Sequence, residues 1–336
     1  MSNLETQPTE STCPAVAGQP APPPDTLLPR QVPLGGPRAM NVRRTLPHRD
    51  IRTVGAWCFV DDYGPAAEAD PPMSVPPHPH IGLQTVTWLL AGEVTHRDST
   101  GAFAVVRPGE LNLMTAGHGI AHSEYSDEAV PGLRGIQMWV ALPEAHRQTT
   151  PRFAHHAELP RIQVSSRSGP DLTATVFMGE FGGVVAPAET FTPLCGVQFS
   201  ATAGCEAELA LRADFEYAVL ALDDPLIVDG EPVPAGALRY LGWGHPTAVI
   251  GTDTAADFLL LGGEPMAEEL VMWWNFVGRS HEEIAAARAD WEAGSTRFGA
   301  VVDDTAVPLA APALPNARLR ARPGRRSDQG LLERGD

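Results

Sequence analysis

Two short stretches contain the residue types and the spacing of a metal site. The first is His78-Pro79-His80, and the second is His122-Ser123-Glu124. In each stretch the two functional residues are two positions apart, which on an extended backbone places both side chains on one face of a strand. Two such strands facing each other would bring three imidazoles and one carboxylate to a common point.

This donor set indicates which ions the site would hold. Three nitrogens and one oxygen suit first-row transition metals such as iron, nickel, copper or zinc, and they suit magnesium and calcium poorly. Four protein ligands leave positions on a five- or six-coordinate ion for water, substrate or O2. The pattern therefore predicts an open and reactive metal site.

The first histidine pair has a simpler alternative, because Pro79 lies in a proline-rich run that would suit a solvated turn. The sequence between the two pairs favours the metal site over this alternative. Residues 85–90, 102–106 and 111–115 are β-rich and are separated by Ala-Gly and Pro-Gly turn signals. They predict a β-meander that could bring the two pairs into register.

Long motifs surround these pairs and carry a family resemblance. They are HPHIGLQTVTWLLAGEVTHRDSTG and PGELNLMTAGHGIAHSE, with VPLGGPRAMNVRRTLP and GAWCFVDDYGP before them and GGEPMAEELVMWWNFVGRSHEEI downstream. Together they resemble the pirin family of the cupin superfamily over residues 32 to about 315. The resemblance implies an all-β bicupin, with two tandem β-barrel or jelly-roll domains and a short C-terminal helix.

The resemblance also implies the identity of the ligands and the metal. The residues that match the four pirin ligands are His78, His80, His122 and Glu124. General cupins instead carry a glutamate four or five residues after the histidine pair, where this chain has Gln84 and Thr85. We therefore expect the carboxylate to come from Glu124, on one divalent transition metal. Fe(II) is the first expectation, with copper, nickel, cobalt or zinc also compatible.

Pirin-like proteins include enzymes that open the flavonol quercetin with O2 and release carbon monoxide. The resemblance therefore implies a flavonol or related phenolic substrate, with Glu124 as the general base that deprotonates its hydroxyl. An alternative is a non-catalytic iron-binding pirin, which acts as a redox-sensitive regulator through a protein partner. A metal-binding cupin isomerase or hydrolase is a third reading, without specific support in the sequence.

Length and composition limit the number of domains, the partners and the compartment that the sequence allows. With 336 residues the chain is long enough for two domains, and its net charge of −17 argues against a nucleic-acid-binding surface. Its four cysteines show no CxxC spacing, which favours free thiols in a reducing compartment. The first residues lack the pattern of a secretory signal, and no apolar run approaches the length of a membrane span. We expect a cytoplasmic protein that does not contact membranes.

The chain divides into four predicted parts. Residues 1–31 are rich in proline and polar residues and are expected to be a disordered tail. Residues 32–160 form the metal-binding cupin domain and residues 161–297 a second cupin domain. Residues 298–336 are an extension that is expected to be disordered from about residue 317. Beyond residue 160 only His245 and His281 occur, and neither has a partner two residues away, so we expect no second metal site.

Several further residues have predicted roles near the site. The neutral imidazoles need hydrogen-bond acceptors for the ring nitrogens that do not bind the metal, and the candidates are Gln84, Thr85, Asp98, Ser123 and backbone carbonyls. His96 is expected to be structural in a hydrogen-bonded turn over residues 96–99, and His118 is a candidate for the pocket mouth. A capping box from Ser280 to Glu283 predicts the start of the one clear helix.

Overall fold

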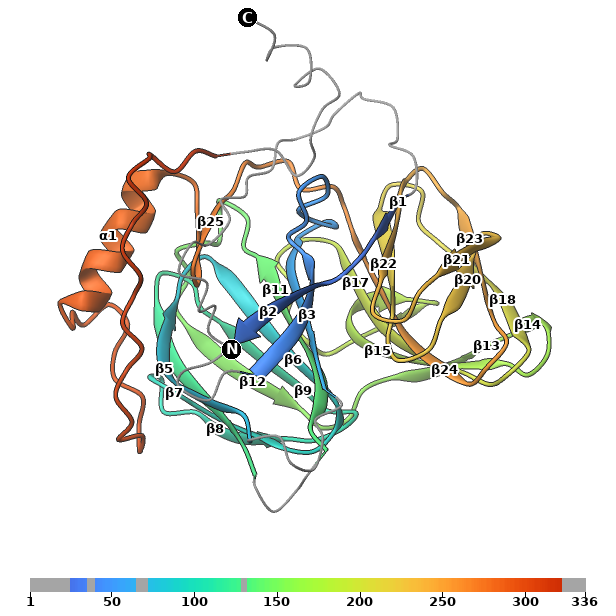
Figure 1. Cartoon of the computed structure of the whole chain (residues 1–336), viewed down its shortest axis with the longest axis horizontal. Helices are drawn as coiled ribbons and strands as arrows, with labels where there is room; N and C mark the ends of the chain where they lie inside the picture. Colours follow the sequence, from blue (N-terminus) through green and yellow to red (C-terminus); the bar gives the residue numbers. More distant parts are fainter. Residues whose placement is uncertain (1–24, 35–39, 65–71, 128–131, 322–336) are drawn as a thin grey trace, which may run out of the picture.

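The computed structural model describes residues 25–34, 40–64, 72–127 and 132–321. Within these ranges the chain forms two β-rich domains side by side, and the helix α1, His281–Glu292, lies against the N-terminal domain (Figure 1). The helix is on the side of that domain that faces away from the C-terminal domain. The predicted all-β fold with two tandem domains and a short C-terminal helix is confirmed.

The N-terminal domain consists of two antiparallel sheets. The larger follows the order β12-β9-β6-β11-β4-β3-β2, and the smaller follows the order β5-β10-β7-β8. The larger sheet contains β12 Arg152–His156, β9 Leu111–Thr115, β6 Leu83–Ala91, β11 Arg134–Ala141, β4 Trp57–Tyr63, β3 Met40–Leu46 and β2 Arg30–Leu34. The smaller sheet contains β5 Ser74–His80, β10 Ile120–Ser126, β7 Val94–Asp98 and β8 Phe103–Val106.

The C-terminal domain repeats this two-sheet arrangement. Its larger sheet contains β1 Asp25–Leu27, β22 Leu238–Trp243, β19 Glu216–Ala221, β24 Ala256–Gly263, β17 Leu194–Ala201, β15 Leu172–Phe181, β13 Arg161–Val164 and β16 Val184–Val185. Its smaller sheet contains β14 Ser166–Ser168, β18 Cys205–Ala210, β23 Thr247–Thr252, β20 Leu226–Val228 and β21 Glu231–Val233.

A hydrophobic core joins the larger sheets of the two domains. Trp57 and Trp88 from the N-terminal domain both contact the ring of Phe177, with ring centroids 6.2 and 4.9 Å apart. The indole N–H of Trp57 donates to the carbonyls of Cys195 and Gly262, at 3.1 and 3.2 Å. Because this buried donor is satisfied across the boundary, the interface combines apolar packing with directional hydrogen bonds.

The chain after the second domain returns to the first one. The hairpin of β25 Val271–Trp273 and β26 Phe276–Gly278 leads into α1, whose N-cap Ser280 accepts a hydrogen bond from the Glu283 amide at 3.2 Å. This confirms the predicted helix start. Buried aromatic residues of the hairpin pack with Ile284 of α1 and with the following coil, as far as Leu319.

Three expectations from the sequence differ from the structure. Residues 25–31 of the predicted disordered tail form β1 and the start of β2, and β1 pairs with β22 of the C-terminal domain. At the other end, Leu319 is buried and its amide donates to His281 Nδ1 at 3.2 Å, so the chain is ordered beyond the expected boundary at about residue 317. The rest of the two predicted tails lies outside the described residues.

The third difference is the predicted β-meander. Residues 85–90 and 111–115 pair with each other in the larger sheet, whereas residues 103–106 pair with β7 in the smaller one. The strands therefore alternate between two sheets instead of following one another in a single sheet. The strands β5 and β10, which carry the predicted ligands, are also neighbours within one sheet, and do not face each other across the domain.

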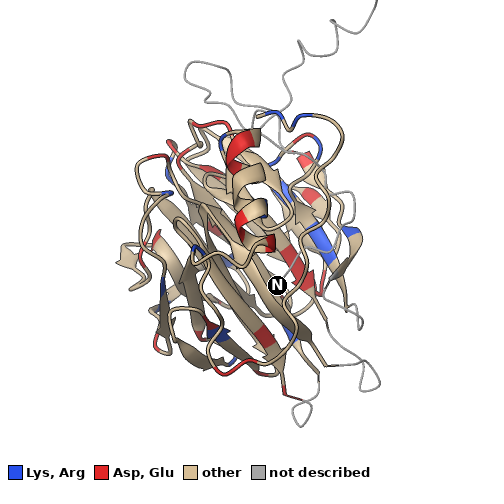
Figure 2. Ribbon diagram, turned by 90° about the vertical axis from the view of Figure 1, so that its left-hand side faces the viewer, with Lys and Arg blue, Asp and Glu red and all other residues tan. Residues whose placement is uncertain are grey.

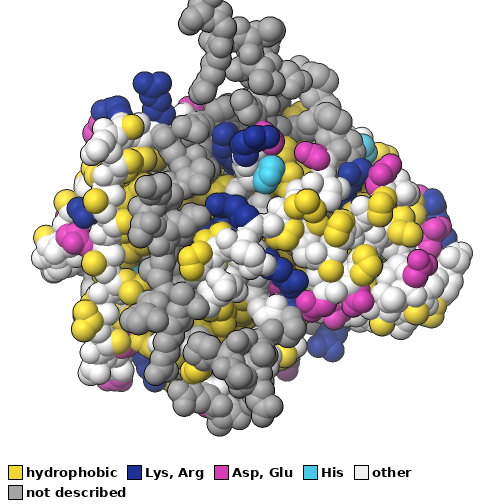
Figure 3. Space-filling model, in the orientation of Figure 1, with side chains coloured by type: hydrophobic (Ala, Val, Ile, Leu, Met, Phe, Trp, Pro, Cys, Tyr) yellow, Lys and Arg dark blue, Asp and Glu magenta, His cyan; other side chains and the backbone are white. Residues whose placement is uncertain are grey.

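Acidic residues occur at both ends of α1, and the strands seen behind the helix carry charged residues of both signs (Figure 2). On the face seen in Figure 3, hydrophobic side chains lie dispersed among polar and charged ones. The three cysteines in the described ranges, Cys58, Cys195 and Cys205, are buried free thiols. Among the residues that the structure describes, no helical segment combines the length and the apolar character needed to cross a membrane.

Candidate metal centre

The two histidine-containing stretches become adjacent strands. In the pairing of β5 with β10, His78 lies opposite His122 and His80 lies opposite Ile120. The prolines of β5 are compatible with a strand because β5 is at the edge of its sheet, where a missing backbone donor is tolerated. An irregularity in the pairing lies between His122 and Glu124, and such bulges redirect side chains next to functional sites.

Three imidazoles converge at this place. His78, His80 and His122 each offer one nitrogen, and these nitrogens lie within 4.8 Å of one another. The ring centroids are 4.3 to 5.1 Å apart. All three side chains are fully buried, and each has an Nε2 atom without a hydrogen-bond partner among the described residues. Unpaired polar atoms in a buried site are unfavourable unless a ligand satisfies them.

The other ring nitrogens fix the tautomers of two of these histidines. His78 Nδ1 donates to the carbonyl of Pro76 at 2.9 Å, and His80 Nδ1 donates to the carbonyl of Asn275 at 3.1 Å. With the proton on Nδ1, each Nε2 carries a lone pair. Burial also lowers the pKa of His78, His80 and His122 well below the ordinary histidine value, which keeps them neutral. Neutral imidazoles with unpaired Nε2 atoms fit a transition metal.

Asn275 belongs to the β25–β26 hairpin, almost two hundred residues after His80. The hairpin is joined to the end of β5 by a bridge between Ile81 and Phe276, and the Val277 amide donates to the Ile81 carbonyl at 3.1 Å. The orientation of His80 therefore depends on the segment that returns from the second domain. The sequence held no side-chain signal for this contact, because the acceptor is a backbone carbonyl.

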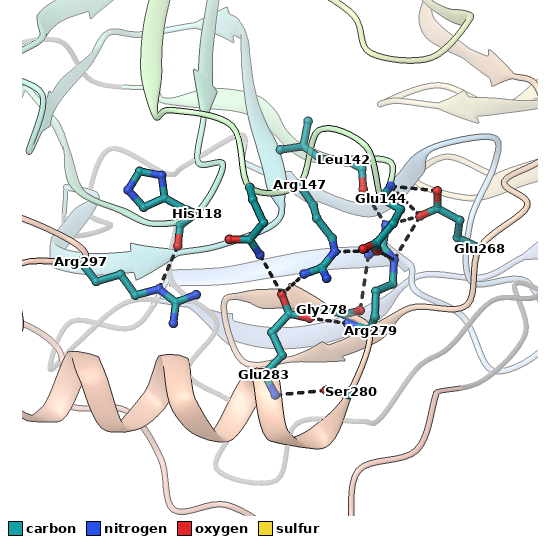
Figure 4. A network of polar contacts seen from close by, with 11 residues as sticks. His118, Leu142, Glu144, Arg147, Glu268, Gly278, Arg279, Ser280, Glu283 and Arg297 are labelled. Carbon is teal, nitrogen blue, oxygen red and sulfur yellow. Dashed lines mark hydrogen bonds and ion pairs between the residues drawn. The ribbon is translucent and has the colours of Figure 1, made fainter.

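A network of ion pairs holds this returning segment in place (Figure 4). Arg147, in the loop after β11, pairs with Glu283 of α1. Arg279 pairs with Glu268 and donates to the carbonyl of Leu142 at 2.7 Å. These contacts connect the start of the helix to the end of a central strand, so they fix the hairpin that supports His80.

Glu124 lies on β10, two residues after His122. A carboxylate oxygen of Glu124 lies within 4.8 Å of ring nitrogens of both His122 and His96, so it joins the cluster through His122. The carboxylate is buried, and its Oε1 atom accepts from the hydroxyl of Thr87 at 3.2 Å. The same hydroxyl lies 2.9 Å from Gln137 Oε1. The predicted carboxylate is therefore next to the triad, and a threonine of the opposite sheet restrains it.

His96 differs from its predicted position. It lies in the strand β7, and the expected turn over residues 96–99 begins only after Asp98. In the pairing of β10 with β7, His96 lies opposite Glu124 and Asp98 lies opposite His122. His96 therefore borders the candidate metal centre, whereas the sequence predicted it in a hydrogen-bonded turn.

Asp98, one of the predicted hydrogen-bond acceptors, accepts from His96 at 3.1 Å. Burial alone would raise the pKa of this carboxyl, but hydrogen bonds from His96 and Thr100 hold its pKa below the ordinary value, so it stays ionised. The predicted backbone-carbonyl acceptors are the carbonyl of Pro76 for His78 and the carbonyl of Asn275 for His80. Gln84, in contrast, donates to Thr115 and to the carbonyl of Glu189.

His118, the candidate for the pocket mouth, lies in the loop before β10 and is half-buried. Its Nδ1 atom is 3.2 Å from the carbonyl of Thr149, and its own carbonyl accepts from Arg297 at 2.9 Å (Figure 4). These contacts anchor the loop to the loop after β11 and to the segment that follows α1. A role of His118 in contacting substrate stays a prediction.

Comparisons with known proteins agree with this geometry. The model of the pirin domain matches residues 39–140, and that of the pirin C-terminal cupin domain matches residues 196–299. The two matches fall on the two β-domains of the structure. The first contains the complete set of candidate ligands and their neighbours on β7.

Individual relatives extend the match over most of the chain. A Pseudomonas aeruginosa protein named "putative quercetin 2,3-dioxygenase" is 43% identical over 85% of this chain and 89% of its own length. A pirin-like protein of Caulobacter vibrioides is 38% identical over 80% and 93%. A crystal structure of quercetin 2,3-dioxygenase from Acinetobacter baumannii is 36% identical, with a TM-score of 0.83 over 89% of this chain and 97% of that one. The chain is therefore a member of the pirin family, built as a bicupin.

Proposed function

We propose that this protein is a metal-dependent dioxygenase that opens a flavonol such as quercetin with O2. The observation that carries the proposal is the convergence of three buried, neutral imidazoles with unpaired Nε2 atoms, next to a buried carboxylate. Relatives at 43% and 36% identity that are named as quercetin 2,3-dioxygenases support the same reaction class.

The proposed ligands are His78, His80, His122 and Glu124. Their three nitrogens and one oxygen suit Fe(II), and also copper, nickel, cobalt or zinc, because such sites discriminate weakly among these ions. When bound, the metal supplies a positive charge that stabilises the flavonol anion and orients it toward O2. The Asn275 carbonyl accepts from His80 and the Pro76 carbonyl accepts from His78, and these hydrogen bonds fix the orientation of the two rings whose Nε2 atoms would bind the metal.

Glu124 is the proposed general base. It takes the proton of the flavonol hydroxyl, so that the substrate becomes the anion that reacts with O2. Both atoms of O2 enter the ring-opened ester product, the ring carbon that carried the deprotonated hydroxyl leaves with its oxygen as carbon monoxide, and the proton returns to the product. Thr87 holds one oxygen of the carboxylate in place at 3.2 Å, which limits its movement during the transfer.

Two buried donors beside the ligands suit an oxygen-rich substrate. Trp139 Nε1 and Gln137 Nε2 are buried and have no hydrogen-bond partner in the part of the chain that the structure describes. The Trp139 ring centroid is 5.2 Å from that of His80, and Gln137 Oε1 shares the Thr87 hydroxyl with Glu124. A flavonol has carbonyl and hydroxyl oxygens that can accept from such donors. We propose that both residues orient the substrate.

The test is quercetin turnover in air by protein reconstituted with Fe(II), measured as loss of flavonol absorbance and release of carbon monoxide. Wild-type protein is expected to turn over, and His80→Ala and Glu124→Gln are expected to lose activity. His245→Ala, in the C-terminal domain, is the matched control and should retain it. Full activity of metal-loaded Glu124→Gln would refute the base assignment. Absence of turnover by metal-loaded wild type would refute the dioxygenase and leave the regulatory alternative.

A further inference from the structure

A hydrogen-bonded chain of three buried side chains ends at one of the proposed ligands. Asp98 Oδ2 lies 3.1 Å from His96 Nε2, and His96 Nδ1 lies 3.4 Å from His122 Nδ1. His96 is 2% exposed, and Asp98 and His122 are fully buried. These hydrogen bonds connect the Asp98 carboxylate on β7 with the His122 imidazole on β10. They reach His122 at Nδ1, on the opposite side of the ring from its unpaired Nε2.

The positions of the protons in this chain follow from donor and acceptor rules. An ionised carboxylate only accepts, so the nitrogen of His96 that contacts Asp98 must carry a hydrogen. A neutral His96 then has a lone pair on Nδ1, and His122 must donate to it from its own Nδ1. His122 Nε2 is left with a lone pair, which is the form that can bind a metal.

The opposite arrangement is unfavourable in a buried site. If His96 donated from Nδ1, the lone pair of its Nε2 would face the Asp98 carboxylate. His122 would then carry its hydrogen on Nε2, directed at the position of the metal. Asp98 therefore selects the tautomer of His122 through His96.

Asp98 and His96 are both fixed by their surroundings. Asp98 Oδ1 accepts from the amide and the hydroxyl of Thr100, at 2.8 and 2.6 Å, and from the amide of Ala102 at 3.2 Å. This leaves Oδ2 for His96. The His96 ring stacks on Phe153, with centroids 4.3 Å apart and an interplanar angle of 17°. The two side chains are therefore held in one orientation before any metal binds.

We infer that His96 and Asp98 are positioning residues that set the tautomer of His122 and thereby the affinity for the metal. His96 also belongs to a potential ligand group with His122 and Glu124. However, one of its ring nitrogens is hydrogen-bonded to Asp98 and the other to His122, which favours a role as a positioning residue over a role as a metal ligand. The inference rests on the proposed ligand set, and it is independent of the flavonol as substrate.

The decisive variant is Asp98→Asn, which keeps the size of the side chain and removes no ligand. Three donors surround Oδ1, so the amide oxygen of the asparagine will occupy that position and its NH2 group will face His96 Nε2. This reverses the hydrogen-bonded chain and places a hydrogen on His122 Nε2. We expect the affinity for Co(II), measured by chelator competition, to fall by roughly 10- to 100-fold.

A double-mutant cycle tests whether Asp98 acts through His96. His96→Phe retains the stacking partner of Phe153 and removes the acceptor for His122. Asp98→Asn should weaken Co(II) binding in the wild-type background and have no further effect in the His96→Phe background. Additive effects, or wild-type affinity in Asp98→Asn, would overturn the inference. Asp229→Asn, whose carboxylate also accepts a backbone amide, is the matched control and should bind Co(II) normally.

Two further measurements keep the inference testable if a variant does not fold. In the 15N NMR spectrum of histidine-labelled wild-type apoprotein, His122 should show a hydrogen on Nδ1 and none on Nε2; the reverse would overturn the inference. The visible spectrum of Co(II) bound to His96→Phe should retain the wild-type donor set, and loss of a nitrogen donor would show that His96 is itself a ligand. Failure of wild type to bind Co(II), or normal binding by His80→Ala, would instead refute the proposed ligand set.

Discussion

The backbone N–H of Gly55 donates to Oε1 of Glu216 at 2.6 Å, across the boundary between the two domains. The other carboxylate oxygen of Glu216 accepts from the hydroxyl of Tyr240 at 2.6 Å. Gly55 has a φ of +54°, and a Cβ atom at this position would lie 2.7 Å from the Cα of Gly263. The two domains therefore approach each other at backbone distance, which only glycine permits here.

Gly55→Ala should accordingly destabilise the protein. The new methyl group would clash with the backbone of Gly263, and alanine is strained at a positive φ. Together these effects should lower the free energy of unfolding by roughly 2–4 kcal/mol. Gly230→Ala, at a φ of +80° in open space, should cost only about 1 kcal/mol from backbone strain. Urea denaturation of both variants measures the difference, and equal midpoints would contradict a close approach of the domains.

Metal removal should lower the thermal stability. An ion that binds the folded protein and not the unfolded chain stabilises it by about 2.7 kcal/mol at a free concentration of 100 times Kd. We expect the Tm of the Co(II)-loaded protein to fall after dialysis against a chelator and to recover when Co(II) is restored. His80→Ala should show no such dependence on Co(II), whereas His245→Ala should behave as wild type. An unchanged wild-type Tm would contradict metal binding at this site.

Gln137→Leu should weaken substrate binding and leave metal binding intact. The amide of Gln137 is a buried donor without a partner, and loss of one hydrogen bond to a substrate oxygen costs about 1 kcal/mol. We therefore expect KM for quercetin to rise by roughly 5- to 10-fold, with unchanged affinity for Co(II). Gln163→Leu, at an exposed position of β13, is the control. An unchanged KM in Gln137→Leu would show that this amide does not contact the substrate.

Much of the fold and the central histidines could be predicted from the sequence, because their signals are local. The spacing of His78 and His80 encodes a shared face, and Ser280 with Glu283 encodes a helix start. The parts that were missed depend on long-range pairing. Residues 25–27 form a strand only because β22 offers them an edge, and Asn275 supports His80 through a backbone carbonyl.

The strand β7 was missed for a related reason. Its inward-facing residues, His96 and Asp98, are polar, and a polar strand next to the sequence Ser-Thr-Gly has the composition of an exposed turn. Both are nevertheless buried, beside the candidate metal centre. Alternation of apolar residues identifies strands that face a hydrophobic core, and it fails where the interior is a functional site.

The pH dependence of metal binding should reflect the burial of the ligands. Three imidazoles with the ordinary pKa of 6.5 would compete with protons and weaken binding by roughly 30-fold between pH 7 and pH 6. Burial lowers the pKa of His78, His80 and His122 well below this value, so they remain unprotonated over that range. A lowered pKa moves the loss of affinity to more acidic pH. We therefore expect a nearly constant Kd for Co(II) from pH 7 to pH 6, measured by chelator competition, and a steep loss only below it. A 30-fold change within that interval would mean that the histidines titrate as exposed groups do.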